Sequence, residues 1–145
     1  VDHHYYGPAR AFHERHTLYD EYDRGGPVVY VGEYGCTGGV GEGNLTAALA
    51  EAVFLLGLER NSDIVQMSSY APLFYNVNDV AWPVNLIGFD NARVVGRSSY
   101  HVQKLFANHR PDEVMRTRVD GDELYALGGV DSGSGEIVMG VTHVL

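Results

Sequence analysis

Two short apolar runs, separated by a long apolar helix pattern, constrain the fold of this chain more than any other feature. Val28–Val31 and the run 64–67 are typical of strands buried on both faces. Between them, residues 45–60 are apolar around much of a helix circumference, so this helix is expected to be buried on more than one side. Strands that alternate with helices form right-handed crossover units in a parallel sheet. The sequence therefore predicts an α/β fold.

Two more helices are expected in the first 110 residues. Pro8 suits a first helical turn, and apolar positions recur near helical spacing until about Tyr22. Ser98 can cap another helix whose apolar side chains share one stripe. A long loop is predicted between that helix and the second strand, over residues 68–97.

The apolar rhythm changes after Arg110-Pro111. Residues 124–130 and 136–145 alternate with a period of two on either side of a Gly/Ser/Asp turn, which predicts an antiparallel hairpin. We therefore divide the chain at this point, into 1–110 and 111–145. Two or three parallel strands cannot close a barrel and leave unpaired edges. The chain, which starts at Val1 without an initiator Met, is expected to be an incomplete fragment of a larger fold.

Charge and cysteine content exclude several classes of function. The 145 residues include 10 Lys or Arg and 19 Asp or Glu, which gives a net charge of −9. An acidic chain lacks the positive face that nucleic acids and anionic membranes require, so neither is expected as a partner. One Cys excludes an internal disulfide framework and a multi-cysteine zinc site. No stretch approaches the ~20 apolar residues of a membrane-spanning helix.

Candidate functional residues follow the predicted strands, because parallel α/β folds collect their sites at the carboxyl ends of strands. Glu33 comes directly after Val28–Val31. His4 and Tyr6 alternate, so on an extended chain they point the same way and could orient a carboxylate. His3 and His4 lack a third ligand at a metal-binding spacing, so we expect neither a metal nor another cofactor.

Two further segments have compositions that bear on ligand binding. The Gly-rich stretch 38–43 has neither a P-loop Lys-Ser/Thr nor dinucleotide spacing, and Glu42 would repel a phosphate, so nucleotide binding is not expected. The predicted loop 68–97 combines aromatic side chains, including Trp82, with amides and carboxylates. This composition suits a sugar site, and it equally suits a loop pinned to the core by its aromatic residues.

The chain resembles the α-L-arabinofuranosidases of glycoside hydrolase family 51 along nearly its whole length, most loosely after Arg110. The matching stretches are Val31-Gly32-Glu33-Tyr34, Gly43-Asn44-Leu45, 47–52, 56–65, 67–74, 76–79, Trp82, Ser99-Tyr100 and Val102-Gln103. The resemblance implies a (β/α)8 TIM barrel followed by a β-sandwich. On that template, residues 1–110 would be the C-terminal part of the barrel and 111–145 the beginning of the antiparallel sandwich.

The resemblance also implies roles for individual residues. Glu33 matches the nucleophile of a retaining glycosidase, and Tyr6 and His4 match residues that line the sugar pocket, with the tyrosine bonded to the nucleophile. Trp82 falls at the rim of that pocket. His3 departs from the family, which commonly has an acidic residue there. The family's acid/base glutamate has no match in the chain, so we expect the isolated chain to be inactive.

The activity implied is release of terminal α-L-arabinofuranosyl units from arabinoxylan, arabinan or their oligosaccharides. Two alternatives remain open: an endoglucanase or xylan-active enzyme on the same fold, and a non-catalytic carbohydrate-binding remnant. Relatives often assemble, so a homo-oligomer is one expected state. A plant-polysaccharide substrate favours an exported enzyme, although the sequence does not fix the location.

Overall fold

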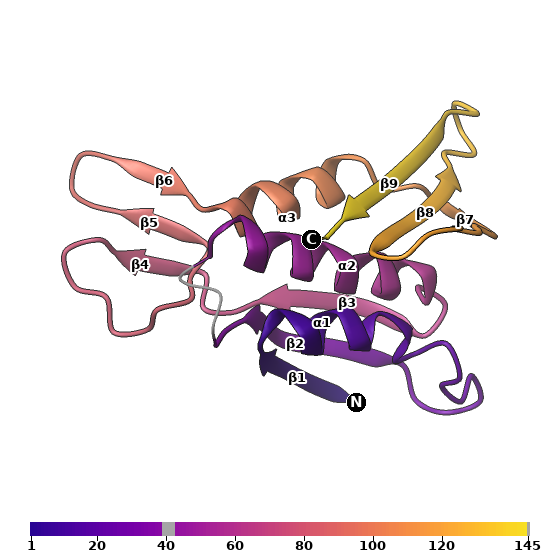
Figure 1. Ribbon diagram of the computed structural model, residues 1–145, viewed down its shortest axis with the longest axis horizontal. Coiled ribbons are helices and arrows are strands. Elements are labelled where there is room, and N and C mark those ends of the chain that lie inside the picture. The colour runs from indigo at the N-terminus through magenta and orange to yellow at the C-terminus, as the bar shows by residue number, and fades with distance from the viewer. Residues whose placement is uncertain (39–42, 145) are drawn as a thin grey trace.

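The computed structural model describes residues 1–38 and 43–144 and contains three small sheets, two of which pack on a central helix while the third extends beyond one end of it (Figure 1). The first sheet is parallel, with the strand order β1-β2-β3. Its strands are β1 (Asp2–Gly7), β2 (Val29–Cys36) and β3 (Val65–Tyr70). Helices connect consecutive strands, as the alternating sequence pattern predicted. In the part of the chain described, no helix is both long and apolar enough to cross a bilayer.

The central helix α2 (Leu45–Arg60) begins and ends where the sequence predicts. The Asn44 side chain accepts a hydrogen bond from the backbone N–H of Ala47 (3.0 Å), which caps the first turn. Residues from Ala47 to Leu58 are buried almost without interruption. α2 lies between the parallel sheet, α3 (Ser98–Asn108) and the C-terminal sheet (Figure 1), and this explains its apolar circumference.

The first crossover is shorter than predicted. The expected helix to about Tyr22 ends earlier, as α1 (Ala9–Glu14) followed by a 3₁₀ turn, η1 (Arg15–Thr17). Phe12 and Tyr19 are nonetheless buried against α2. The apolar spacing thus identified Phe12 and Tyr19 as packing residues, whereas Leu18, another apolar position of the pattern, is exposed. Turns replace the last part of the helix.

The predicted loop 68–97 is wrong as a single loop. β3 continues to Tyr70, and three short strands follow that form a separate mixed sheet. They are β4 (Phe74–Asn76), β5 (Ile87–Phe89) and β6 (Val94–Gly96). Strands of three residues are too short to show a clear period in the sequence, so the pattern did not reveal them.

The C-terminal antiparallel sheet agrees with the predicted hairpin. β8 (Leu124–Val130) pairs with β9 (Ile137–His143), and β7 (Glu113–Met115) adds a third strand. Gly140 of β9 lies so close to Leu56 of α2 that a β-carbon there would clash. The change of period near residue 111 therefore corresponds to a change of sheet, whereas the division into two domains stays a prediction.

The regular in-and-out alternation of side chains along β2 is interrupted at Gly32 and Glu33. Val29 and Val31 are buried on the helix side, and after Gly32 and Glu33 the side chains of Tyr34 and Cys36 are buried. The pairing of β1 with β2 shifts between His3 and His4, and that of β2 with β3 shifts between Val31 and Tyr34. Such irregularities redirect side chains and are frequent beside functional sites.

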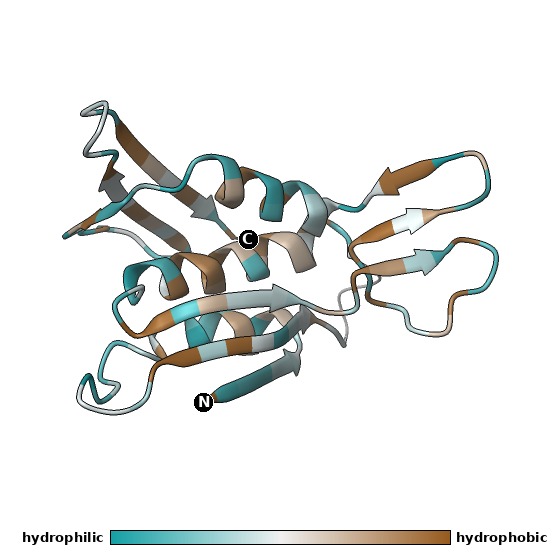
Figure 2. Ribbon diagram, turned by 180° about the vertical axis from the view of Figure 1, so that it is seen from behind, coloured by the Kyte–Doolittle hydropathy of each residue, from teal (hydrophilic) through white to brown (hydrophobic). Residues whose placement is uncertain are grey.

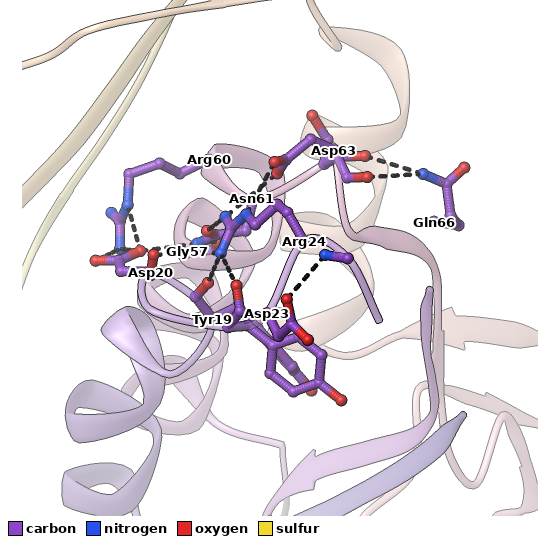
Figure 3. A network of polar contacts seen from close by, with 12 residues as sticks. Tyr19, Asp20, Asp23, Arg24, Gly57, Arg60, Asn61, Asp63 and Gln66 are labelled. Atoms are coloured by element: carbon purple, nitrogen blue, oxygen red, sulfur yellow. Dashed lines mark hydrogen bonds and ion pairs between the residues drawn. The ribbon is translucent and has the colours of Figure 1, made fainter. Parts of the chain in front are cut away.

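A dense polar network lies at the amino-terminal ends of β2 and β3 (Figure 3). Arg24 donates to both carboxylate oxygens of Asp63 (3.0 and 3.3 Å), to Asn61 Oδ1 (2.6 Å) and to three backbone carbonyls. Arg60 and Asn61 both donate to Asp20. The network ties the segment before β2 to the end of α2 and the start of β3.

Candidate functional site

The face of the parallel sheet that turns away from the helices is open in Figure 2, and β1 there is almost uniformly hydrophilic. Asp2, His4 and Tyr6 alternate along β1 and lie beside Glu33 of β2. The sequence predicted Glu33 just past the end of its strand, but β2 continues to Cys36, so Glu33 lies within the strand at the irregularity described above.

The Glu33 carboxylate contacts both predicted partners. The Tyr6 hydroxyl donates a hydrogen bond to Glu33 Oε2 (2.9 Å), and His4 Nδ1 lies 3.6 Å from the same oxygen. The Glu33 side chain is 44% exposed. A carboxylate that is held by a hydroxyl and still open to solvent can be approached by a small polar molecule.

Tyr6 links the site to the next strand and to the rim. Its hydroxyl also lies 3.3 Å from the carbonyl oxygen of Ala71, just after β3. Burial, the hydrogen bond to Glu33 and the charge of Glu33 together raise the pKa of Tyr6 to about 12. The phenol therefore keeps its proton at neutral pH and remains a hydrogen-bond donor to Glu33.

Trp82 lies at the edge of this group. Its ring is edge-on to that of Tyr6, with 6.5 Å between centroids, and it is 51% exposed. Asn85 is buried and donates its side-chain amide to the carbonyl oxygen of Trp82. The structure therefore brings all four predicted site residues together, and the aromatic side chain of Trp82 is available to a ligand.

One residue that the sequence reading missed completes the cluster. Asp2 lies 3.0 Å from His4 Nε2 through Oδ2, and its Oδ1 accepts the backbone N–H of Gly32 (3.1 Å). A β-carbon on Gly32 would clash with this carboxylate. Asp2 shares the two-residue period of His4 and Tyr6, and this signal could have identified it.

His3 does not join the site. His3 points to the helix side, where its Nδ1 lies 2.9 Å from Tyr19 Oη and 3.1 Å from Tyr5 Oη. Residues 39–42 of the Gly-rich stretch, including Glu42, lie outside the described residues. Within 1–38 and 43–144, no group of three or more His, Cys, Asp or Glu side chains is placed to hold a metal ion.

Two cavities lie elsewhere in the structure. One of about 790 Å³ lies between β3, α2 and the end of α3, and one of about 320 Å³ lies between α2, α3 and β9. Neither is lined by Glu33, His4, Tyr6 or Trp82. The candidate site is therefore the open face of the parallel sheet, where the polar side chains of β1 contact Glu33. This face forms an exposed surface and not a closed cavity.

Comparisons with known proteins identify the family of the chain. The family described as "Alpha-L-arabinofuranosidase C-terminal domain" matches residues 32–136. The chain belongs to the α-L-arabinofuranosidases of glycoside hydrolase family 51. This confirms the resemblance deduced from the sequence.

Two curated relatives illustrate the similarity. An extracellular exo-α-L-arabinofuranosidase of Streptomyces chartreusis is 42% identical over 118 residues, which are 81% of this chain and 14% of the relative. α-L-Arabinofuranosidase 1 of Arabidopsis thaliana is 43% identical over 122 residues, which are 83% of this chain and 18% of the relative. The chain thus spans less than a fifth of the length of either relative.

Solved structures extend the comparison to the fold. An arabinose-bound structure named MgGH51 α-L-arabinofuranosidase superposes with a TM-score of 0.91 and 30% identity, over 98% of this chain and 25% of that one. The α-L-arabinofuranosidase of Thermotoga maritima, in an arabinose complex, has a TM-score of 0.74 at 13% identity, over 97% of this chain and 37% of that one. The second similarity concerns the fold alone.

Proposed function

We propose that this chain contributes the nucleophile side of a retaining glycosidase that releases terminal, non-reducing-end α-L-arabinofuranosyl units from arabinose-containing polysaccharides or oligosaccharides. The observation that carries the proposal is the Glu33 carboxylate, which is bonded to Tyr6 and open to solvent in a chain of this family. Residues 1–110 would form the C-terminal part of a (β/α)8 barrel, and 111–145 the beginning of a β-sandwich.

The reaction proceeds in two displacements. An oxygen of Glu33 attacks the anomeric carbon, the glycosidic bond breaks, and a second carboxylic acid about 5–5.5 Å away gives its proton to the leaving oxygen. That group, now a carboxylate, takes a proton from water as the water attacks the same carbon. The bond to Glu33 breaks, so the free sugar leaves and both carboxyl groups return to their starting states.

The surrounding residues position the nucleophile. The Tyr6 hydroxyl holds Oε2 of Glu33 and so limits the rotation of the carboxylate. His4 is held in turn by Asp2, and Trp82 offers an apolar surface to a sugar ring at the rim. No residue of this chain matches the acid/base glutamate that the family resemblance implies, and we assign the acid/base to a part of the protein outside these 145 residues.

The test is Glu33→Gln in the complete protein, with an activated nitrophenyl α-L-arabinofuranoside as substrate. Gln cannot form the glycosyl ester, so kcat/KM is expected to fall by about a thousandfold or more. Glu21→Gln, at an exposed turn, is the matched control and should leave the rate unchanged. Activity of Glu33→Gln within tenfold of the unmodified protein would refute the proposal.

A second experiment examines the covalent step and the missing acid. Protein stopped during turnover should gain the mass of one arabinosyl group on the peptide that contains Glu33. The isolated 145-residue chain, shown to be folded by circular dichroism, should not turn over the substrate. Turnover by that chain that is lost on Glu33→Gln would contradict the assignment of the acid/base to another part of the protein.

A further inference from the structure

A second carboxylate lies behind the proposed nucleophile, on the helix side of the same strand. Glu51 of α2 is fully buried, although helices seldom bury a carboxylate without a specific partner. Its Oε1 accepts the backbone N–H of Cys36, at the end of β2, over 2.8 Å. The proposed reaction does not use this residue, so its burial has to be explained in another way.

The position of Cys36 explains why a side chain is needed there. The paired register of β2 and β3 ends at Tyr34 and Tyr70, and the last bond between these segments runs from Ala71 N to Tyr34 O (3.1 Å). Cys36 lies beyond that point, so β3 offers no acceptor to its N–H. The Glu51 carboxylate takes the place of the missing strand neighbour, in a bond strengthened by charge when it is ionised.

The same end of β2 carries the proposed nucleophile. Gly35 lies against the carbonyl oxygen of Ala71 and the ring of Tyr6, which bonds Glu33. On its other side β2 pairs with β1, where the carbonyl of Gly7 accepts the N–H of Thr37 (2.7 Å). β1 is itself an edge strand of this chain. Two side-chain hydrogen bonds link the end of β2 to the helix layer: Tyr34 donates its hydroxyl to Gln103 of α3 (2.8 Å), and Glu51 of α2 accepts the backbone N–H of Cys36.

We propose that Glu51 is a positioning residue for the glycosidase site: its hydrogen bond to the Cys36 N–H fixes the end of β2 and thereby the orientation of Glu33 against Tyr6. The proposal rests on the proposed function for its effect on catalysis. The clamp itself, a carboxylate bonded to a backbone amide, can be measured without any substrate.

Three variants of the complete protein separate the acceptor from the charge. Glu51→Gln keeps an oxygen of the same reach, so kcat is expected within threefold and Cys36 amide exchange within threefold. Glu51→Met keeps the length but removes the acceptor, so kcat should fall at least tenfold with KM within twofold, and the Cys36 amide should exchange at least tenfold faster. Glu51→Asp keeps the charge but is one methylene too short, and it should behave like Met.

The outcomes are distinct. A folded Glu51→Met or Glu51→Asp protein with kcat within twofold of the original overturns the proposal, and so does a Gln variant as impaired as the Met variant. If Met prevents folding, the comparison of Asp with Gln decides. Failure of the proposed function would appear separately, as retained activity of Glu33→Gln, while the exchange of the Cys36 amide would still report on the clamp.

Discussion

The two ends of the parallel sheet carry polar clusters of opposite character. At the amino-terminal ends, Arg24 is saturated with hydrogen bonds to Asp63, Asn61 and three carbonyls (Figure 3). Toward the carboxyl ends, Glu33 has one hydroxyl donor and stays 44% exposed. In parallel α/β folds, chemistry is found at the carboxyl ends of strands and stability at the other end. A polar side chain whose hydrogen-bonding groups are all used within the protein contributes to stability. One that keeps an exposed, unused acceptor can also bind a ligand.

The largest expected effect concerns pH, because the two ends should respond in opposite directions. Burial raises the pKa of Glu51 from 4.5 to about 7, and the neighbouring Tyr34, Tyr70 and Cys36 have raised pKa values and stay neutral in that range. Between pH 4.5 and 7 the Glu51 carboxyl group is mostly protonated in the folded state and mostly ionised in the unfolded state. The contribution of Glu51 to the free energy of unfolding is therefore fully present below about pH 4.5. It falls by about 3 kcal/mol as the pH rises through 7.

Thermal unfolding of the Glu51→Gln protein from pH 4 to 9 measures this effect. The loss of stability toward alkaline pH should be smaller than in the unmodified protein. At the other end, the Arg24 hydrogen bond lowers the pKa of Asp63, so its contribution is present at neutral pH and lost as the pH falls. Asp63→Asn is the matched comparison and should change only the acidic side. Identical pH profiles for both variants would contradict the contrast between the two ends.

The next effect concerns stability alone. Arg24→Met removes the donor from Asn61, Asp63 and three carbonyls, so the free energy of unfolding is expected to fall by about 2 kcal/mol. Activity of the folded variant should change less than twofold, since the cluster is remote from Glu33. Urea denaturation compares it with Arg10→Met, which breaks only the exposed pair Arg10–Glu14 and should cost less than about 0.5 kcal/mol. Equal losses from the two variants would show that the network adds nothing.

The smallest effect belongs to the open end. Tyr6→Phe removes the hydroxyl that bonds Glu33 and keeps the ring beside Trp82, so kcat should fall about tenfold, equivalent to about 1.4 kcal/mol. Stability should change little because the site is half exposed. Steady-state kinetics of the complete protein checks this, with Tyr30→Phe as the control that removes only the hydroxyl bonded to Ser69. A kcat for Tyr6→Phe equal to that of the Tyr30→Phe protein would remove Tyr6 from the positioning group.

Sequence reasoning was most successful where a pattern repeats over many residues. Helix 45–60 and the hairpin were predicted within a residue or two, since their apolar periods extend over several turns or strand pairs. Alternation along β1 also placed His4 and Tyr6 on one face, and the structure brings both to Glu33. The role of Glu33 as nucleophile stays a proposal.

The features that were missed depend on contacts between distant segments. The three short strands after β3 exist through pairing across residues 74–96, which leaves no local period. The sequence did not single out Glu51, because nothing near it in sequence shows that its carboxylate meets the N–H of Cys36. The helix expected to Tyr22 ended early, although its aromatic residues pack as predicted.

The interrupted alternation at Gly32-Glu33 bears on how the register of β2 is selected during folding. With regular alternation from Val31, the side chain of Glu33 would enter the layer beneath α2, and Tyr34 would move to the open face. Any pairing error of one residue along β2 would thus bury an unpartnered carboxylate, which is strongly unfavourable. The residue proposed for chemistry therefore also opposes the wrong strand register.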